Sequence, residues 1–145
     1  MGAPARFNVR VYGLWIHGGR ILVNEELIRG RQVIKFPGGG LELGEGAIDG
    51  LKREWQEELN LDISVTAHYY TTDFYQPSAF DNSQVISIYY LVSADPDQPI
   101  ANTVPEERTY WLPLADLQEG TFTLPIDRVV GNMLMAQHPT EHPES

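Results

Sequence analysis

The sequence predicts an α+β domain in which one sheet is covered on both faces by helices. Segments rich in Val, Ile and Tyr recur along most of the chain, as strands do. Apolar residues recur at helical spacing over about 47–59, and Pro125 suits the first turn of a last helix over about 126–137. The length suits a single domain spanning 1–145, with a polar tail at 138–145.

The strands follow from apolar runs that are bounded by turn residues. We expect them at 7–17, 20–27, 33–36, 63–75, 85–93 and 108–114, with Gly18 and Gly19 making the first hairpin turn. Five glycines then fall within residues 38–46, a density that we expect to exclude any regular element. Such a loop is typical of a backbone that bends sharply or approaches another group closely.

The helix over 47–59 carries an apolar stripe on one side, made of Ala47, Ile48, Leu51, Trp55 and Leu59. Asn60 follows directly. Because Asn tolerates the left-handed conformation that closes many helices, we expect the helix to end there.

Composition excludes several classes of protein. The chain has no cysteine, which excludes a disulfide framework, a thiolate zinc site and a cysteine nucleophile. Its net charge of −10 disfavours binding to nucleic acid. No apolar run is long enough to span a membrane and no signal peptide is evident, so we expect a cytoplasmic protein without a membrane partner.

Three acids lie on one side of the helix, beside the apolar stripe. Glu54, Glu57 and Glu58 fall within about 100° of one another on a helical projection, and Glu58 lies nearest the stripe, where it should be partly desolvated. A solvated surface with compensating cations is the simpler interpretation. The glycine-rich segment before the helix favours a second one, because carboxylate and carbonyl oxygens are the ligands of a hard cation such as Mg²⁺.

The segment from Gly39 to Leu61 resembles the Nudix box. The fixed positions of that motif match at their full spacing, namely Gly39, Glu45, Arg53, Glu54, Glu57, Glu58 and Leu61. Two positions depart from the family pattern. Asn60 replaces the usual Gly, and Trp55 replaces an aliphatic residue and should be accommodated by repacking of the core.

The resemblance implies a Nudix-like α/β/α sandwich with a central mixed sheet, and it assigns roles within the box. Mg²⁺, with Mn²⁺ as the alternative, would be held by Gly39, Glu54, Glu57 and Glu58. Arg53 would position the catalytic carboxylates together with Glu45, a structural residue of the box. The acid that accepts a proton from water would be Glu57 or Glu58, or else Glu106 or Glu107 in a later loop. The simpler interpretation of Glu106 and Glu107 is that both are solvated residues of that loop without a catalytic role.

Outside the metal site, Phe80 and Gly40 are the candidate substrate-binding residues. Phe80 lies in a polar loop, where its ring would stack on a base, cap the pocket, meet a second subunit or fold back onto the core.

The resemblance implies Mg²⁺-dependent hydrolysis of the diphosphate bond in a small nucleoside-diphosphate-X substrate, by attack of water at phosphorus. A nucleoside-triphosphate pyrophosphohydrolase of the sanitising type is the alternative. A non-catalytic nucleotide-sugar sensor ranks lower, because it predicts eroded carboxylates, and a purely structural role leaves the acidic stripe unexplained. Whether the chain forms a homodimer stays open.

Overall fold

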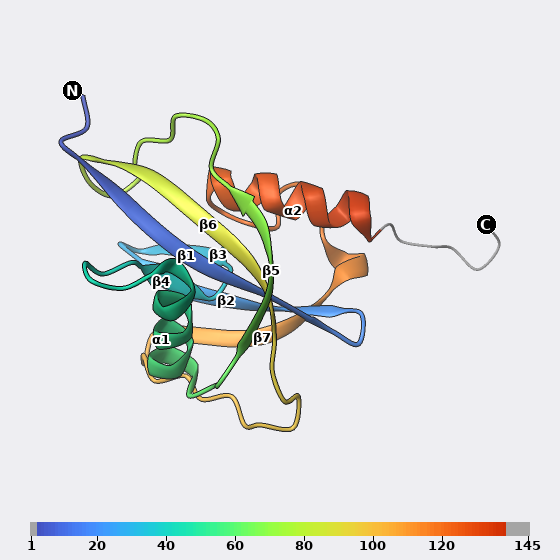
Figure 1. Ribbon diagram of the computed structural model, residues 1–145. Helices are drawn as coiled ribbons and strands as arrows, with labels where there is room; N and C mark the ends of the chain where they lie inside the picture. The colour runs from blue at the N-terminus through green and yellow to red at the C-terminus, as the bar shows by residue number, and fades with distance from the viewer. Residues whose placement is uncertain (1–2, 139–145) are drawn as a thin grey trace.

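The computed structural model describes residues 3–138, and it confirms the predicted class of fold, with a mixed sheet between two helices (Figure 1). Most of the predicted tail, 139–145, lies outside the described residues. The strands are β1 (Arg6–His17), β2 (Arg20–Ile28), β3 (Arg31–Lys35), β4 (Gly38–Gly40), β5 (Ser64–Thr71), β6 (Ser83–Ser93) and β7 (Glu107–Pro113). The helices are α1 (Ala47–Leu59), the 3₁₀ turn η1 (Leu114–Asp116) and α2 (Pro125–Gln137).

The sheet is built around β1. Its strand order is β3-β2-β1-β6-β5, with β4 paired to β1 and β7 paired to β2. β1 runs parallel to β6, from Arg6 opposite Ser83 to Trp15 opposite Val92, and the other named pairs are antiparallel. This combination of directions makes the sheet mixed, as expected.

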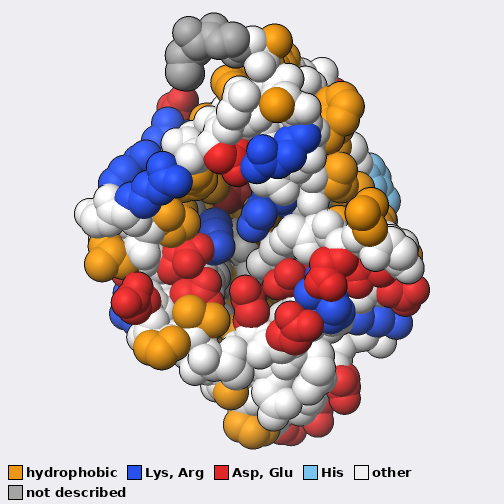
Figure 2. Space-filling view, turned by 90° about the vertical axis from the view of Figure 1, so that its left-hand side faces the viewer, with side chains coloured by type: hydrophobic (Ala, Val, Ile, Leu, Met, Phe, Trp, Pro, Cys, Tyr) orange, Lys and Arg blue, Asp and Glu red, His pale blue; other side chains and the backbone are white. Residues whose placement is uncertain are grey.

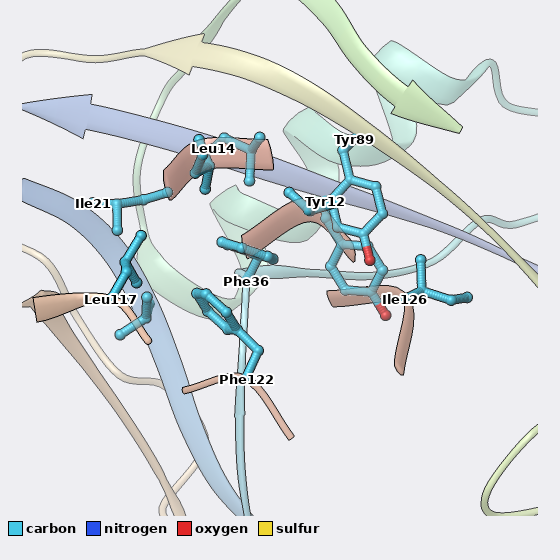
Figure 3. Packing of buried hydrophobic residues seen from close by; sticks show 11 residues of the cluster. Tyr12, Leu14, Ile21, Phe36, Tyr89, Leu117, Phe122 and Ile126 are labelled. Atoms are coloured by element: carbon cyan, nitrogen blue, oxygen red, sulfur yellow. The ribbon is translucent and has the colours of Figure 1, made fainter. Parts of the chain in front are cut away.

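Buried side chains form one apolar layer on each face of the sheet. Successive residues of a strand point to opposite faces, so Val11 and Trp15 of β1 pack toward α1 while Tyr12 and Leu14 pack toward α2. In the layer under α2, shown in Figure 3, the rings of Phe36 and Phe122 lie 4.2 Å apart between their centroids. Each helix is therefore fixed by its own half of the core.

The glycine-rich segment differs from the prediction in one respect. Gly38–Gly40 forms the short strand β4, so the expectation of no regular element is wrong for these three residues. They pair with β1, and a Cβ atom on Gly38 would lie 2.0 Å from the carbonyl oxygen of Val11. Glycine permits this pairing because it has no side chain to collide with β1.

One helix and one strand end for different reasons, the helix at a local capping residue and the strand where its pairing becomes irregular. Asn60 adopts the left-handed conformation, at φ 54° and ψ 40°, and ends α1 as expected. The strand predicted to run from 63 to 75 ends at Thr71, after two irregularities in its pairing with β6. Bulges of this kind bend a strand away from its partner and shorten the regular pairing.

Trp55 is accommodated by a glycine on the neighbouring strand. Its side chain is fully buried, and its indole Nε1 donates a hydrogen bond to the carbonyl oxygen of Pro37 at 3.0 Å. A Cβ atom on Gly13 of β1 would lie 2.6 Å from Cζ2 of this indole. The bulky residue in the box and the glycine in β1 therefore fit one another.

This fit predicts that substitutions at the two positions are coupled. Trp55→Leu should lower the free energy of unfolding by about 2–4 kcal/mol through the volume that it vacates. Gly13→Ala should lower the free energy of unfolding by about 1–3 kcal/mol through overpacking. Gly13 does not adopt a left-handed conformation, so backbone strain should not add to this loss. In the double variant the added methyl enters the vacated space, so its loss should be smaller than the sum. Urea unfolding of the four proteins measures this, and additive losses would contradict the coupling.

Candidate active site

Arg53 ties the loop of the box to its helix. Its Nε donates to Glu45 Oε2 at 2.9 Å and its Nη2 donates to Glu45 Oε1 at 2.7 Å, which is a two-point pairing. The same Nη2 donates to the carbonyl oxygen of Gly40 at 3.1 Å. These hydrogen bonds from Arg53 hold the pKa of Glu45 down at about 2, so the pair stays charged at any neutral pH.

Arg53 also reaches the acids of its own helix. Its Nη1 lies 3.2 Å from Glu54 Oε1 and 3.2 Å from Glu57 Oε1, while Glu42 is farther away at 3.5 Å and is 62% exposed. Only 23% of the Arg53 side chain is exposed. An isolated surface ion pair is therefore a poor description of Arg53, which connects the loop to two of the candidate ligands.

The acids of α1 lie partly out of water. Only 13% of the Glu54 side chain is exposed, and burial raises its pKa. Burial, followed by the charges of Glu107 and Glu54, raises the pKa of Glu58 to about 7. Gly39 adjoins this group, because a Cβ atom there would lie 2.6 Å from the carboxyl group of Glu54. A bound cation would relieve the repulsion that these shifts reflect.

The candidate metal ligands do not form a compact cluster among the described residues. Within residues 3–138, no three His, Cys, Asp or Glu side chains are gathered at the spacing of metal ligands. Glu57 is 60% exposed, and its Oε1 lies 3.2 Å from Nη1 of Arg53. The donor set fits a hard cation, since every candidate ligand is an oxygen.

Of the two later-loop candidates, the structure brings only Glu107 to the acids of α1. Glu107 begins β7 opposite Glu26 of β2, and burial together with Glu26 raises its pKa to about 7. Glu106 is exposed.

Glu26 and Lys35, which form a largely buried ion pair, were not predicted as site residues. The available signal was a lysine in an otherwise apolar strand, directly before Phe36 and Pro37.

A pocket adjoins the acidic group on the α2 side of the sheet. Its lining includes Glu26, Lys35, Tyr12 and Tyr89, and Phe80 lines it from the loop before β6. The guanidinium of Arg29 lies 5.9 Å from the centre of the Phe80 ring. Figure 2 shows one face hollowed between groups of acidic side chains, with basic side chains inside the hollow.

Phe80 thus lines a pocket, and its role in substrate binding stays a prediction. Gly40 is placed differently, beside the pocket, and its carbonyl oxygen accepts the hydrogen bond from Arg53.

Solved structures share this fold. The MutT protein of Methanosarcina mazei Go1 is 19% identical, with a TM-score of 0.74 over 97% of this chain and 99% of that chain. The MutT Nudix hydrolase of Burkholderia pseudomallei is also 19% identical, with a TM-score of 0.73 over 87% and 96%. A bifunctional NMN adenylyltransferase/ADP ribose pyrophosphatase of Francisella tularensis is 23% identical, with a TM-score of 0.67 over 90% and 41%. Likeness at these identities establishes the fold.

No curated protein matches the chain. Within the described residues, none of the helices has the length and apolar character needed to cross a bilayer. The family model for the NUDIX domain matches residues 6–132, which is most of the sequence. This protein therefore belongs to the Nudix family and is a Nudix-type pyrophosphohydrolase.

Proposed function

We propose that this protein hydrolyses the diphosphate bond of a small nucleoside-diphosphate-X substrate in a reaction that depends on Mg²⁺ or Mn²⁺. One observation carries the proposal. Glu54, Glu58 and Glu107 are partly buried, and Glu107 lies opposite Glu26, which lines the pocket. All three acids have a raised pKa, because burial and the charge of a neighbouring acid disfavour their charged forms. Such a group is suited to a divalent cation and an anionic substrate together.

The metal would be held by Glu54, Glu57 and Glu58, with the backbone carbonyl of Gly39 as a further oxygen ligand. When bound, it would neutralise the diphosphate and make a coordinated water more acidic. Arg53 would keep Glu54 and Glu57 in place, because it is itself fixed to Glu45 and Gly40. Arg53 and Glu45 therefore act as positioning residues in this proposal.

A carboxylate must accept the proton of the attacking water, and Glu107 is the best-placed acid for this role. Its pKa of about 7 is close to neutral pH, where an acid both takes and releases a proton readily. Glu106 is exposed, whereas Glu107 is partly buried and its charge acts on Glu58 of α1. Glu57 and Glu58 remain the alternative proton acceptors.

The identity of X rests on the pocket. Its mixture of aromatic, apolar and charged side chains suits a nucleoside better than a bare polyphosphate. A nucleoside-triphosphate pyrophosphohydrolase stays the alternative function, and one structural relative carries the name of an ADP ribose pyrophosphatase. The cytoplasmic location and a homodimer stay predictions.

Removal of one acid of α1 should abolish turnover without unfolding the protein. Glu57→Gln keeps the size of the side chain but removes a ligand charge, so turnover of nucleotide substrates with Mg²⁺ should fall by about 10²-fold or more. Glu57 is 60% exposed, so the thermal midpoint should stay close to that of the wild type. Glu119→Gln, an equal change at an exposed position away from the site, is the control. Phosphate release is measured over nucleotide sugars, dinucleotides and triphosphates, and unchanged turnover would refute the mechanism.

The two acids of the later loop form a matched pair. Glu107→Gln should lower kcat by about 10²–10⁴-fold if Glu107 accepts the proton of water, whereas Glu106→Gln should leave kcat within about twofold. The substrate concentration for half-maximal rate should change little in either variant. A large loss in Glu106→Gln alone would reverse the assignment.

Metal affinity should depend on pH. Because the pKa of Glu58 is raised to about 7, this acid is charged above pH 7 and protonated below it, and only the charged form binds a cation. The concentration of Mg²⁺ that gives half the maximal rate should therefore rise as the pH is lowered from about 8 to about 6. Glu58→Gln should weaken metal binding at high pH and flatten this dependence. A wild-type requirement for Mg²⁺ that is the same across this range would disprove the role of Glu58.

A further inference from the structure

Asn24 is a buried amide in the middle of the strand β2. It is 2% exposed, and it directly follows Leu22 and Val23, which both lie in the core. Asn is unfavourable in strands, and an apolar side chain at this position would continue the core. The Oδ1 atom of Asn24 is moreover buried without a hydrogen-bond partner in the described part of the chain. A residue that costs free energy in this way is expected where it has a task in a functional site.

The amide group of Asn24 is turned toward β7. Its Nδ2 donates a hydrogen bond to Thr109 Oγ1 at 3.3 Å, and Thr109 lies directly opposite Asn24 in the pairing of β2 with β7. Glu107 precedes Thr109 by two residues, so it lies on the same face of the sheet, diagonally across from Asn24. Long side chains at such diagonal positions are within reach of one another.

Two groups favour the charged form of Glu107, and they do so in different ways. Burial and the neighbouring Glu26 raise the pKa of Glu107 to about 7, whereas the charge of Lys35 and a hydrogen bond from Asn24 act in the opposite direction. Lys35 forms its ion pair with Glu26, so it acts on Glu107 only through its field. A hydrogen bond is directional, so Asn24 is the group that can fix where the carboxylate of Glu107 lies.

Glu107 needs such a fixed donor because acids repel it from two elements. Glu26 lies directly opposite it on β2, and the charges of Glu107 and of Glu58 on α1 act on one another. A glutamate side chain has several rotatable bonds, so this repulsion would turn its carboxylate toward solvent. A displacement of about 1 Å is enough to lower the rate of an enzyme strongly, so the position of a proton acceptor matters.

We propose that Asn24 is a positioning residue for Glu107. Its Nδ2 donates to the carboxylate of Glu107 while Thr109 holds the amide in place, and the carboxylate is thereby kept beside the acids of α1. Asn24 itself neither takes nor gives up a proton. The inference rests on the proposed function, in which Glu107 accepts the proton of the attacking water. It also explains why an amide with an unpaired oxygen occupies a strand position that suits a core residue.

A double-mutant cycle of Asn24 with Glu107 tests the proposal. Asn24→Leu removes the donor with little change in size, so kcat with Mg²⁺ should fall about tenfold while KM changes by less than about twofold. In Glu107→Gln, which has no carboxylate left to position, the same substitution should cost less than about twofold. An equal loss in both backgrounds would show that Asn24 acts only on the fold and would overturn the proposal. So would an unchanged kcat in Asn24→Leu or in Glu107→Gln.

A second variant guards against a folding defect. The thermal midpoint of Asn24→Leu should stay close to that of the wild type, because removal of the unpaired Oδ1 offsets the lost hydrogen bonds. If this variant does not fold, Thr109→Val decides, since Thr109 holds the amide and is only partly buried. Its kcat should fall about threefold or more, and less in Glu107→Gln. The control Thr66→Val, at an exposed position on β5, should keep full kcat, and equal values for the two variants would reject the proposal.

Crystal structures separate this inference from the proposed function. The carboxylate of Glu107 should be displaced in Asn24→Leu, or in Thr109→Val if only that variant folds, relative to the wild type. A carboxylate that keeps its place in the variant would overturn the positioning role, whatever the protein hydrolyses. A displaced carboxylate in a protein that hydrolyses none of the substrates tested would refute the proposed function and leave the contact between Asn24 and Glu107 established.

Discussion

Repulsion among the carboxylates of α1 is the constraint around which the site is arranged. Glu54 and Glu58 lie one helical turn apart and are both partly buried, and burial raises the pKa of each. In an isolated helix such a pair would be merely unfavourable. Here Arg53 contacts Glu54 and Glu57 and is itself neutralised by Glu45, so part of the repulsion is offset. The repulsion that remains among these carboxylates favours the binding of a cation beside them.

Close packing of the backbone makes this arrangement specific. Gly39 leaves room for the carboxyl group of Glu54, and a Cβ atom on Gly50 would lie 2.8 Å from Oε1 of Glu45. The two glycines therefore let a strand and a helix approach the acids that Arg53 connects. Their role is steric, because neither needs a left-handed conformation. The spacing of the box thus reflects contacts between β4, the loop and α1.

Local structure was predictable because its causes lie close together in sequence. The apolar stripe of α1 and the closing Asn60 set the bounds of the helix, and the structure has it at Ala47–Leu59 as predicted. The pairing of Arg53 with Glu45 follows a motif of fixed spacing. By contrast, Glu26 meets Glu107 only through the register of β2 with β7, and Tyr89 meets Asp127 only through the packing of α2 on the sheet. Sequence periodicity holds no information on such registers, so these partners were missed.

The charges that line the pocket do not by themselves explain how a protein with a net charge of −10 accepts an anionic substrate. Lys35 is buried, which opposes its charge, yet its contact with Glu26 outweighs this and raises its pKa. Because Lys35 and Glu26 compensate one another, that pair contributes little net field. Arg10 has no ion-pair partner among the described residues, but Asp127 lines the same pocket, so the lining carries two basic and two acidic side chains. A cation at the acids of α1 is therefore what would offset the negative field for an anionic substrate.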